Sequence, residues 1–351
     1  MHLPLHLGKG DVQMAKLTKA ERAVIEQLLT HGVFTGTKTS DMKASAMAAR
    51  DAYQKPEGQR RINGWFNQVF GRMPQSFQDN WVWLMGPGQL SSAEITVLLA
   101  TLKAVINTPA AQGVEADRVI EARPVIASVQ TVTPALSDKQ VGKMIDDLLV
   151  QRFQLLTPDN PVNADSTAAS LVVDEYWDVA VDFVAIAQLL VQAMQASLQT
   201  TNESVSAQQQ VSAYLLKHRY MDQDAGSLWT TLLQQKDQIS AVWQPLQRFY
   251  LEVGDDYAAL LDADRRQLSS RQYFIALAVA RPLKSGLPDD LLGTRIKQLA
   301  RQLYPKANVN QTQVKAELQL NGLAKCVHGS WIATPLAQRF AITLEDDDFG
   351  E

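Results

Sequence analysis

The clearest pattern of apolar and polar positions lies near the end of the chain. Apolar residues recur at helical spacing in three stretches and then alternate with polar residues in two short runs. The three stretches predict helices at Gln272–Arg281, Asp289–Tyr304 and Gln311–Leu320. The two runs predict strands at Leu323–Val327 and Ser330–Ala333, joined by a tight turn at His328-Gly329.

Three helices followed by a two-stranded hairpin is the order of a winged helix, a module that docks on DNA or on proteins. We assign this module to residues 270–342. The fold class that the sequence predicts is therefore mainly α, with winged-helix modules on either side of a helical middle region.

A second winged helix is predicted for residues 90–175. Ser91 and Glu94 form a capping box that begins a helix ending near Ile106. The elements predicted after it are a helix at Glu115–Glu121, an extended Val125–Val132, a helix from Ser137 to about Gln151, the segment Phe153–Leu156, a turn-rich Thr157–Ser166 and a strand at Leu171–Val173.

Residues 1–89 form a basic, aromatic-rich region that is predicted to be helical. Thr18 and Glu21 make a capping box for a first helix, and Gly32 suits its left-handed C-terminal position. A second helix is expected from Asp41 to Tyr53, before Pro56 and Gly58. The remainder of this region, from Arg60 to Gly88, is expected to be a small lid or a mixed patch of helix and strand.

Residues 176–269 form an acidic middle region with helical periodicity, and residues 343–351 form an acidic tail. The helices predicted for the middle region are Tyr176–Leu198, Ser206–Tyr220, Ser227–Val253 and Tyr257–Gln267. Long helices of this kind are stable when their apolar faces pack together or against another chain, so this region is a candidate for protein contacts, including a homodimer.

Charge is segregated along the chain. The formal net charge of −4 conceals a net +4 over residues 1–89 and +7 over residues 271–342, with an acidic middle and five acidic residues in the tail. A polyanion is therefore expected to meet the ends of the chain.

No motif indicates catalysis, and we expect a non-enzymatic protein without a cofactor or metal. Gly8-Lys9-Gly10 lacks the spacing of a phosphate-binding loop, and the pair Cys326 and His328 supplies too few ligands for zinc. The acidic pairs have no accompanying lysine that would complete a nuclease site. The single cysteine and the absence of a secretory signal or a long apolar run predict a cytoplasmic protein without a membrane span.

The predicted contact is with the double-stranded DNA backbone. It comprises cations on and around the second and third helices and the first strand of the C-terminal module: Arg295, Lys297, Arg301, Lys306, Lys315 and Lys325. The third helix carries no arginine for bidentate guanine contacts, which argues for binding that does not read the sequence. In residues 90–175, Lys139 and Lys143 stand beside Asp138, Asp146 and Asp147, which favours protein docking there.

Two further features have both a structural and a functional interpretation. Arg60, Arg61 and Arg72 around Trp65 could form a platform for exposed bases, although tryptophans are more often core or interface anchors. The acidic tail is either a solubilising segment or a mimic of a polyanion that covers the basic C-terminal module.

The stretch from Asn321-Gly322-Leu323-Ala324-Lys325 through Trp331-Ile332-Ala333-Thr334 closes a wing and enters a short helix at Pro335–Phe340. Together with the helical middle and the first module, it resembles the kleisin and kite subunits of bacterial SMC-type complexes of the Muk and Mks class. The resemblance implies a DNA-associated scaffold that binds other subunits, including an ATPase, in DNA maintenance or defence against foreign DNA. The alternatives are a homodimeric transcription or replication regulator and an enzyme with a site assembled from scattered carboxylates.

Overall fold

The computed structural model describes residues 16–38, 42–84, 90–112, 118–159, 176–199, 205–263 and 270–339. Within these residues the chain is mainly helical and contains four small antiparallel sheets of three strands each. Each sheet belongs to a separate unit, and in each unit the strand that is last in sequence lies between the other two.

The first unit begins with a helix whose N-terminus is capped by the predicted box, in which Thr18 accepts from the Glu21 amide and Glu21 accepts from the Thr18 amide. Gly32 ends this helix in the left-handed conformation, also as predicted. The elements are α1 (Lys19–His31), β1 (Val33–Thr35), α2 (Ala44–Gln54), α3 (Pro56–Phe70), β2 (Gln75–Phe77) and β3 (Asn80–Val82).

The second unit has the same order of elements. Its first helix begins at the predicted capping box of Ser91 and Glu94. The elements are α4 (Ser92–Ile106), η1 (Pro109–Ala111), β4 (Val119–Glu121), α5 (Ala122–Val132), α6 (Asp138–Ile145) with its π-helical continuation η2 (Asp146–Arg152), β5 (Leu156–Pro158) and β6 (Tyr176–Val179).

A long helix, α7 (Phe183–Gln199), leads from the second unit to the third. In the third unit a single 3₁₀ turn takes the place of the second helix. The elements are α8 (Ala207–His218), β7 (Tyr220–Met221), η4 (Gln223–Ala225), α9 (Ser227–Trp243), η5 (Gln244–Leu246), β8 (Phe249–Val253) and β9 (Ala258–Asp262).

The fourth unit matches the predicted helices and hairpin to within about a residue. Both residues of the turn, His328 and Gly329, have positive φ, as a two-residue type I′ hairpin turn requires. The elements are α10 (Arg271–Ala280), η7 (Leu283–Ser285), β10 (Leu287–Pro288), α11 (Asp289–Leu303), α12 (Gln311–Leu320), β11 (Ala324–Val327), β12 (Ser330–Ala333) and α13 (Leu336–Arg339).

Several predicted elements are wrong. Val125–Val132 is not extended but lies in α5, and the helix predicted at Glu115–Glu121 ends in a strand, Val119–Glu121. In the acidic middle region, strands replace the ends of predicted helices at Tyr176–Val179, Phe249–Val253 and Ala258–Asp262. The predicted strand Leu171–Val173 and most of the Thr157–Ser166 turn lie outside the described residues, as does the tail from residue 340 onward.

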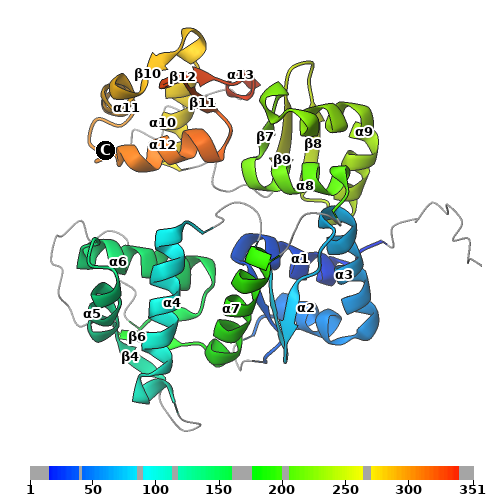
Figure 1. Ribbon diagram of the computed structural model, residues 1–351, viewed down its shortest axis with the longest axis vertical. Helices are drawn as coiled ribbons and strands as arrows, with labels where there is room; N and C mark the ends of the chain where they lie inside the picture. Colours follow the sequence, from blue (N-terminus) through cyan, green and yellow to red (C-terminus); the bar gives the residue numbers. More distant parts are fainter. Residues whose placement is uncertain are drawn as a thin grey trace, which may run out of the picture.

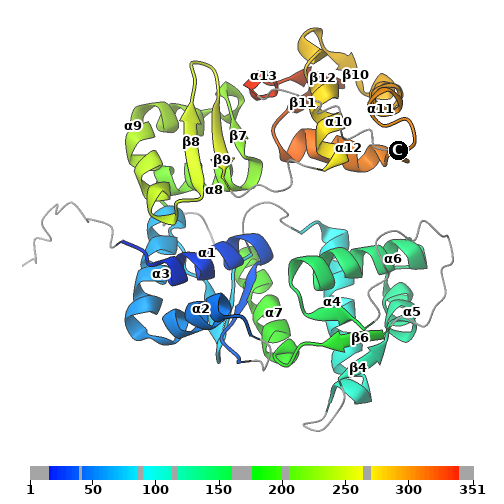
Figure 2. The same cartoon turned by 180° about the vertical axis from the view of Figure 1, so that it is seen from behind.

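The four units follow an open arc in the order second, first, third, fourth (Figures 1 and 2). One apolar core joins the first unit to the third and contains Phe66, Phe70 and Trp243. A second core lies in the second unit, takes in α7 and reaches Val33 and Val82 of the first unit. The fourth unit has a core of its own, and only a small cluster around Tyr220, Ala259 and Leu336 joins it to the third.

Candidate nucleic-acid interface

The exposed face of α11 carries Lys297 and Arg301, two of the six basic residues predicted to contact DNA. Leu292, Ile296 and Ala300 face the core of the fourth unit, and this spacing leaves Lys297 and Arg301 exposed one helical turn apart. Lys306, just beyond the helix, is also exposed. Among the described residues none of these three cations has a carboxylate partner, so all three are free to meet phosphate.

Arg295 lies on the border of this face and is half-buried. Its Nη1 donates to Gln298 Oε1 at 3.1 Å, which directs the guanidinium along the helix surface. We call the four residues Arg295, Lys297, Arg301 and Lys306 the α11 stripe. Contact between cations and the phosphate backbone neutralises charge without reading bases, and this is the contact that the sequence predicts for these residues.

Lys315 has a partner inside the fourth unit. Its Nζ lies 2.6 Å from Asp289 Oδ1 and 5.4 Å from the centre of the Trp331 ring. The Trp331 indole donates to the same carboxylate oxygen at 2.7 Å. The hydrogen bond from Lys315, with that from Trp331, holds the pKa of Asp289 below its ordinary value. Lys315 thus connects α12 to the start of α11 and to the hairpin. It does not belong to the α11 stripe.

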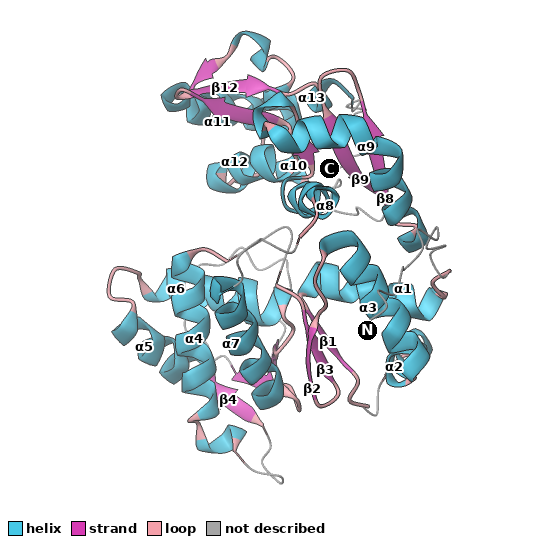
Figure 3. Ribbon diagram, turned by 45° about the vertical axis from the view of Figure 1, so that its right-hand side comes forward, coloured by secondary structure: helices cyan, strands magenta, loops and turns pink. Residues whose placement is uncertain are grey.

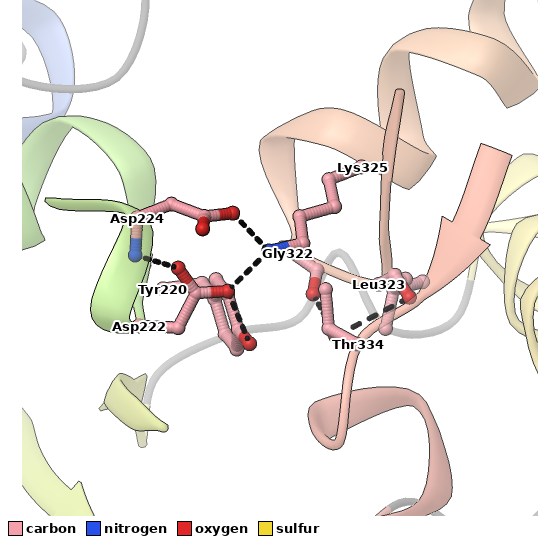
Figure 4. Close-up of polar contacts among 7 residues, drawn as sticks. All are labelled: Tyr220, Asp222, Asp224, Gly322, Leu323, Lys325 and Thr334. Atoms are coloured by element: carbon pink, nitrogen blue, oxygen red, sulfur yellow. Dashed lines mark hydrogen bonds and ion pairs between the residues drawn. The ribbon is translucent and has the colours of Figure 1, made fainter. Parts of the chain in front are cut away.

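Lys325 has partners in another unit. Figure 4 shows its side chain reaching from β11 to Asp222 and Asp224 of the third unit. Its Nζ is 2.7 Å from Asp222 Oδ2 and also bonds Asp224. Burial alone would lower the pKa of Lys325, but the hydrogen bonds to the two carboxylates outweigh it and raise that pKa. No local feature of the sequence indicates this contact, because the partners are far apart along the chain.

Asp222 is itself held in place by its neighbours. Its Oδ1 accepts the Asp224 amide at 3.0 Å, and its Oδ2 accepts the Tyr220 hydroxyl at 3.1 Å. Burial and the nearby Asp222 raise the pKa of Tyr220, so that its hydroxyl stays a donor. A second ion pair, between Arg339 of α13 and Glu252 of β8, lies at the same junction between the third and fourth units.

The N-terminal group does not form an exposed platform. Trp65 is only 3% exposed, and its indole donates to the Val242 carbonyl at 3.2 Å. Arg61 donates to Glu21 through Nε at 2.8 Å and through Nη2 at 2.5 Å. Arg60 is exposed, and Arg72 is half-buried with a partner of its own. With its ring covered by the third unit, Trp65 offers no face on which a base could stack.

The Glu21 carboxylate is almost fully buried and, through Arg61, links α1 to α3. Burial opposes its ionisation, but hydrogen bonds from Arg61 and Thr18 outweigh that effect and hold the pKa of Glu21 below its ordinary value. Arg61 therefore fastens α3 to the N-terminus of α1, and this is a structural role.

The chain matches no family model, no curated protein and no solved structure in comparisons with known proteins. Among the described helices none is both long and apolar enough to cross a membrane. The described residues also contain no group of three or more His, Cys, Asp and Glu side chains arranged to hold a metal ion.

Proposed function

We propose that this chain is a non-enzymatic, DNA-associated scaffold subunit built from four winged-helix units, in which the α11 stripe contacts the DNA backbone and other surfaces hold protein partners. The observation that carries the proposal is the α11 stripe, four cations of which three are exposed and free of ion pairs with other described residues. The order helix, strand, helix, helix, strand, strand, or its shortened form in the third unit, supports the assignment of winged helices.

The third helices of the units support binding that does not read the sequence. In the first unit α3 is packed against the third unit, so it is closed to a DNA groove. In the fourth unit the exposed residues of α12 include Thr312, Gln313 and Gln319 but no arginine. Backbone contact by α11 would give affinity that falls steeply with salt and depends little on the DNA sequence.

The second unit supports a different role, because its third helix carries both signs of charge. Asp138, Lys139, Lys143 and Asp147 are all exposed on α6 and η2. Such a face is repelled by phosphate nearly as much as it is attracted, and it suits a protein partner of complementary charge. The proposed function is that of an accessory subunit similar to those of SMC-type complexes, which act in DNA maintenance or defence against foreign DNA.

The test is retention of a 40-base-pair DNA duplex by the full chain at low salt. The triple variant Arg295→Glu, Lys297→Glu, Arg301→Glu is expected to lose retention while its circular dichroism spectrum stays unchanged. The matched control makes the same charge change elsewhere, with Lys139→Glu, Lys143→Glu and Lys236→Glu, and is expected to keep most of its binding. Retention by the α11 variant equal to that of the control would refute the stripe as the DNA contact.

A competition experiment separates the scaffold from a sequence-specific regulator. Unlabelled duplexes of unrelated sequence and equal length should displace the bound DNA equally well if the backbone is the contact. A complex that resists displacement by all but one sequence would favour the regulator. Hydrolysis of DNA or of nucleotides by the purified chain alone would contradict the non-enzymatic assignment.

A further inference from the structure

An apolar groove runs between α4 and α7, on a part of the molecule remote from the α11 stripe. The two helices lie side by side (Figure 3) and enclose a groove of about 410 Å³. The lining residues come from each helix at intervals of three and four positions: Leu99, Leu102, Lys103, Ile106 and Asn107 from α4, and Val184, Ala187, Gln188, Val191 and Gln192 from α7.

Large apolar side chains in this groove are exposed to solvent. Leu99 is 39% exposed and Val184 is 58% exposed, although Leu102 and Ala187 at the floor are buried. Contiguous apolar surface of this kind is a mark of protein contact sites, whereas scattered single residues are not.

The charge of the groove is equally distinctive. The sequence of α7 from Phe183 to Gln199 contains no ionisable residue. Lys103 is the only charged side chain among the lining residues, and no described residue forms an ion pair with it. The nearby carboxylate at the start of α7, Asp182, does not line the groove and accepts from the hydroxyls of Thr35 and Thr37 in the first unit. Surfaces depleted of charge are typical of the centres of protein interfaces.

We propose that the groove between α4 and α7 binds an amphipathic α-helix of a partner protein, with apolar side chains spaced three and four residues apart and a carboxylate that pairs with Lys103. Two helices that leave a slot between them are completed by a third helix, which is how apolar grooves recognise helical peptides. This inference deepens the proposed scaffold function, on which it rests, by assigning a partner surface.

Lys103, which has no carboxylate partner among the described residues, favours a different protein over a second copy of this chain. Two copies that met through this face would each bring Lys103 and no carboxylate from the groove lining. A partner that brings the carboxylate satisfies the charge and also gains specificity against helices that carry lysine at that place.

The experiment uses two synthetic peptides of 18 residues, stapled as helices on their polar face. Both have leucines at positions i, i+3, i+4 and i+7, and they differ only in a glutamate or a lysine beside the leucine stripe. Binding to the full chain is measured by fluorescence anisotropy. The glutamate peptide is expected to bind about threefold more tightly or better, the size of a partly exposed ion pair. The variant Lys103→Glu is expected to reverse this preference.

Leu99→Asp is expected to weaken both peptides about tenfold, as the loss of an apolar anchor does. The matched control is Leu233→Asp, on α9 in the third unit, where the leucine is 44% exposed, and its binding should equal that of the wild type. Absence of binding, equal affinity for both peptides, or an unchanged affinity in Leu99→Asp would each overturn the proposal. A concentration-dependent dimer that Leu99→Asp dissolves would also overturn it, because a second copy would then occupy the groove.

The DNA readout keeps this inference separate from the proposed function. Leu99→Asp should retain the 40-base-pair duplex as the wild type does, because the α11 stripe lies in another unit. If Leu99→Asp binds neither peptide but still retains the DNA duplex, the defect lies in the groove. Loss of DNA retention in the α11 variant with peptide binding intact would separate the two sites in the opposite way.

Discussion

Trp65 of α3 meets Trp243 at the end of α9 edge to face, with ring centroids 6.0 Å apart and an interplanar angle of 72°. Phe70 contacts both rings, and the Trp65 indole donates to the Val242 carbonyl. This contact joins the first and third units through α3 and α9, so these two units pack around a shared core.

Trp65→Ala should therefore destabilise the first and third units together. Removal of a buried aromatic side chain of this size is expected to lower the free energy of unfolding by about 3–5 kcal/mol. Unfolding in urea measures this loss. Tyr250→Ala, at a tyrosine that is 56% exposed, is the control and should cost little. A loss below about 1 kcal/mol in Trp65→Ala would mean that the shared core does not depend on this contact.

Local signals in the sequence predict the helices and the hairpin of the fourth unit, but not the short strand β10 that pairs with β12. The hairpin at His328-Gly329 could be predicted because both turn residues tolerate positive φ and the flanking runs alternate. In the third unit the turn at Gly254 with Asp255 and Asp256 falls between two predicted elements, but the residues that flank it form the strands β8 and β9 and not helices. The error at α5 came from its β-branched residues, whose strand propensity was overridden by packing of Val125 and Val129 into the core.

The sequence predicts the surroundings of a candidate site residue only where the position of that residue on its own helix decides them. Helical spacing accounts for the exposure of Lys297 and Arg301 on α11, and their contact with DNA stays a prediction. The partners of Lys325 and Trp65 lie in other units, and their contacts depend on how the units pack. No local pattern encodes that packing, so the sequence predicts Lys325 as a DNA contact and leaves Trp65 between a base-stacking platform and a core or interface anchor, of which the structure shows the anchor.

Gly322 allows the third and fourth units to approach closely. A Cβ at this position would lie 2.4 Å from the Tyr220 Cβ, and the backbone has a φ of +61°. Gly322→Ala should therefore destabilise the chain by the cost of positive φ and by the clash with Tyr220. Gly329→Ala isolates the first of these costs, because its φ is +76° and no described atom would lie within 4 Å of the added methyl carbon.

The expected cost of Gly329→Ala is about 1 kcal/mol. Gly322→Ala should exceed it by roughly 1–3 kcal/mol, the usual range for overpacking. Thermal unfolding of the two variants measures the difference. Equal stability of the two variants would show that Tyr220 moves aside freely.

The ion pairs of Lys325 should control how often the third and fourth units separate. Lys325→Met leaves Asp222 and Asp224 close together without a cation, and this repulsion weakens the junction. Hydrogen exchange should become about fivefold faster in peptides that cover Tyr220–Gly226 and Gly322–Val327, the size expected for a partly exposed pair. Lys284→Met, at an exposed lysine without a carboxylate partner among the described residues, should leave exchange unchanged. Unchanged exchange in Lys325→Met would mean that apolar contacts alone hold the junction.

The affinity for DNA should carry the signature of backbone contact by the α11 stripe. Each phosphate contact contributes about 0.9 to the slope of log K against log salt concentration. Lys297→Gln should therefore reduce the slope by about one and weaken binding equally for duplexes of different sequence. Lys236→Gln is the control. A change in sequence preference without a change in slope would contradict a phosphate contact at Lys297.

The junction between the third and fourth units should loosen in acid. The hydrogen bond from Arg339, followed by that from Tyr257, holds the pKa of Glu252 below its ordinary value. A carboxyl whose pKa is lowered by folding stabilises the folded state above its unfolded pKa, and this stabilisation is lost as the pH falls through the folded pKa. The unfolded reference is about 4.5, so the loss should appear below that pH. Hydrogen exchange of peptides that cover β8 and α13, measured at pH 6 and at pH 3.5 after correction for the intrinsic rate, should show faster opening at the lower pH. Arg339→Gln should remove most of this difference, because it removes the main cause of the lowered pKa. An acid response of equal size in that variant would assign it to other carboxylates.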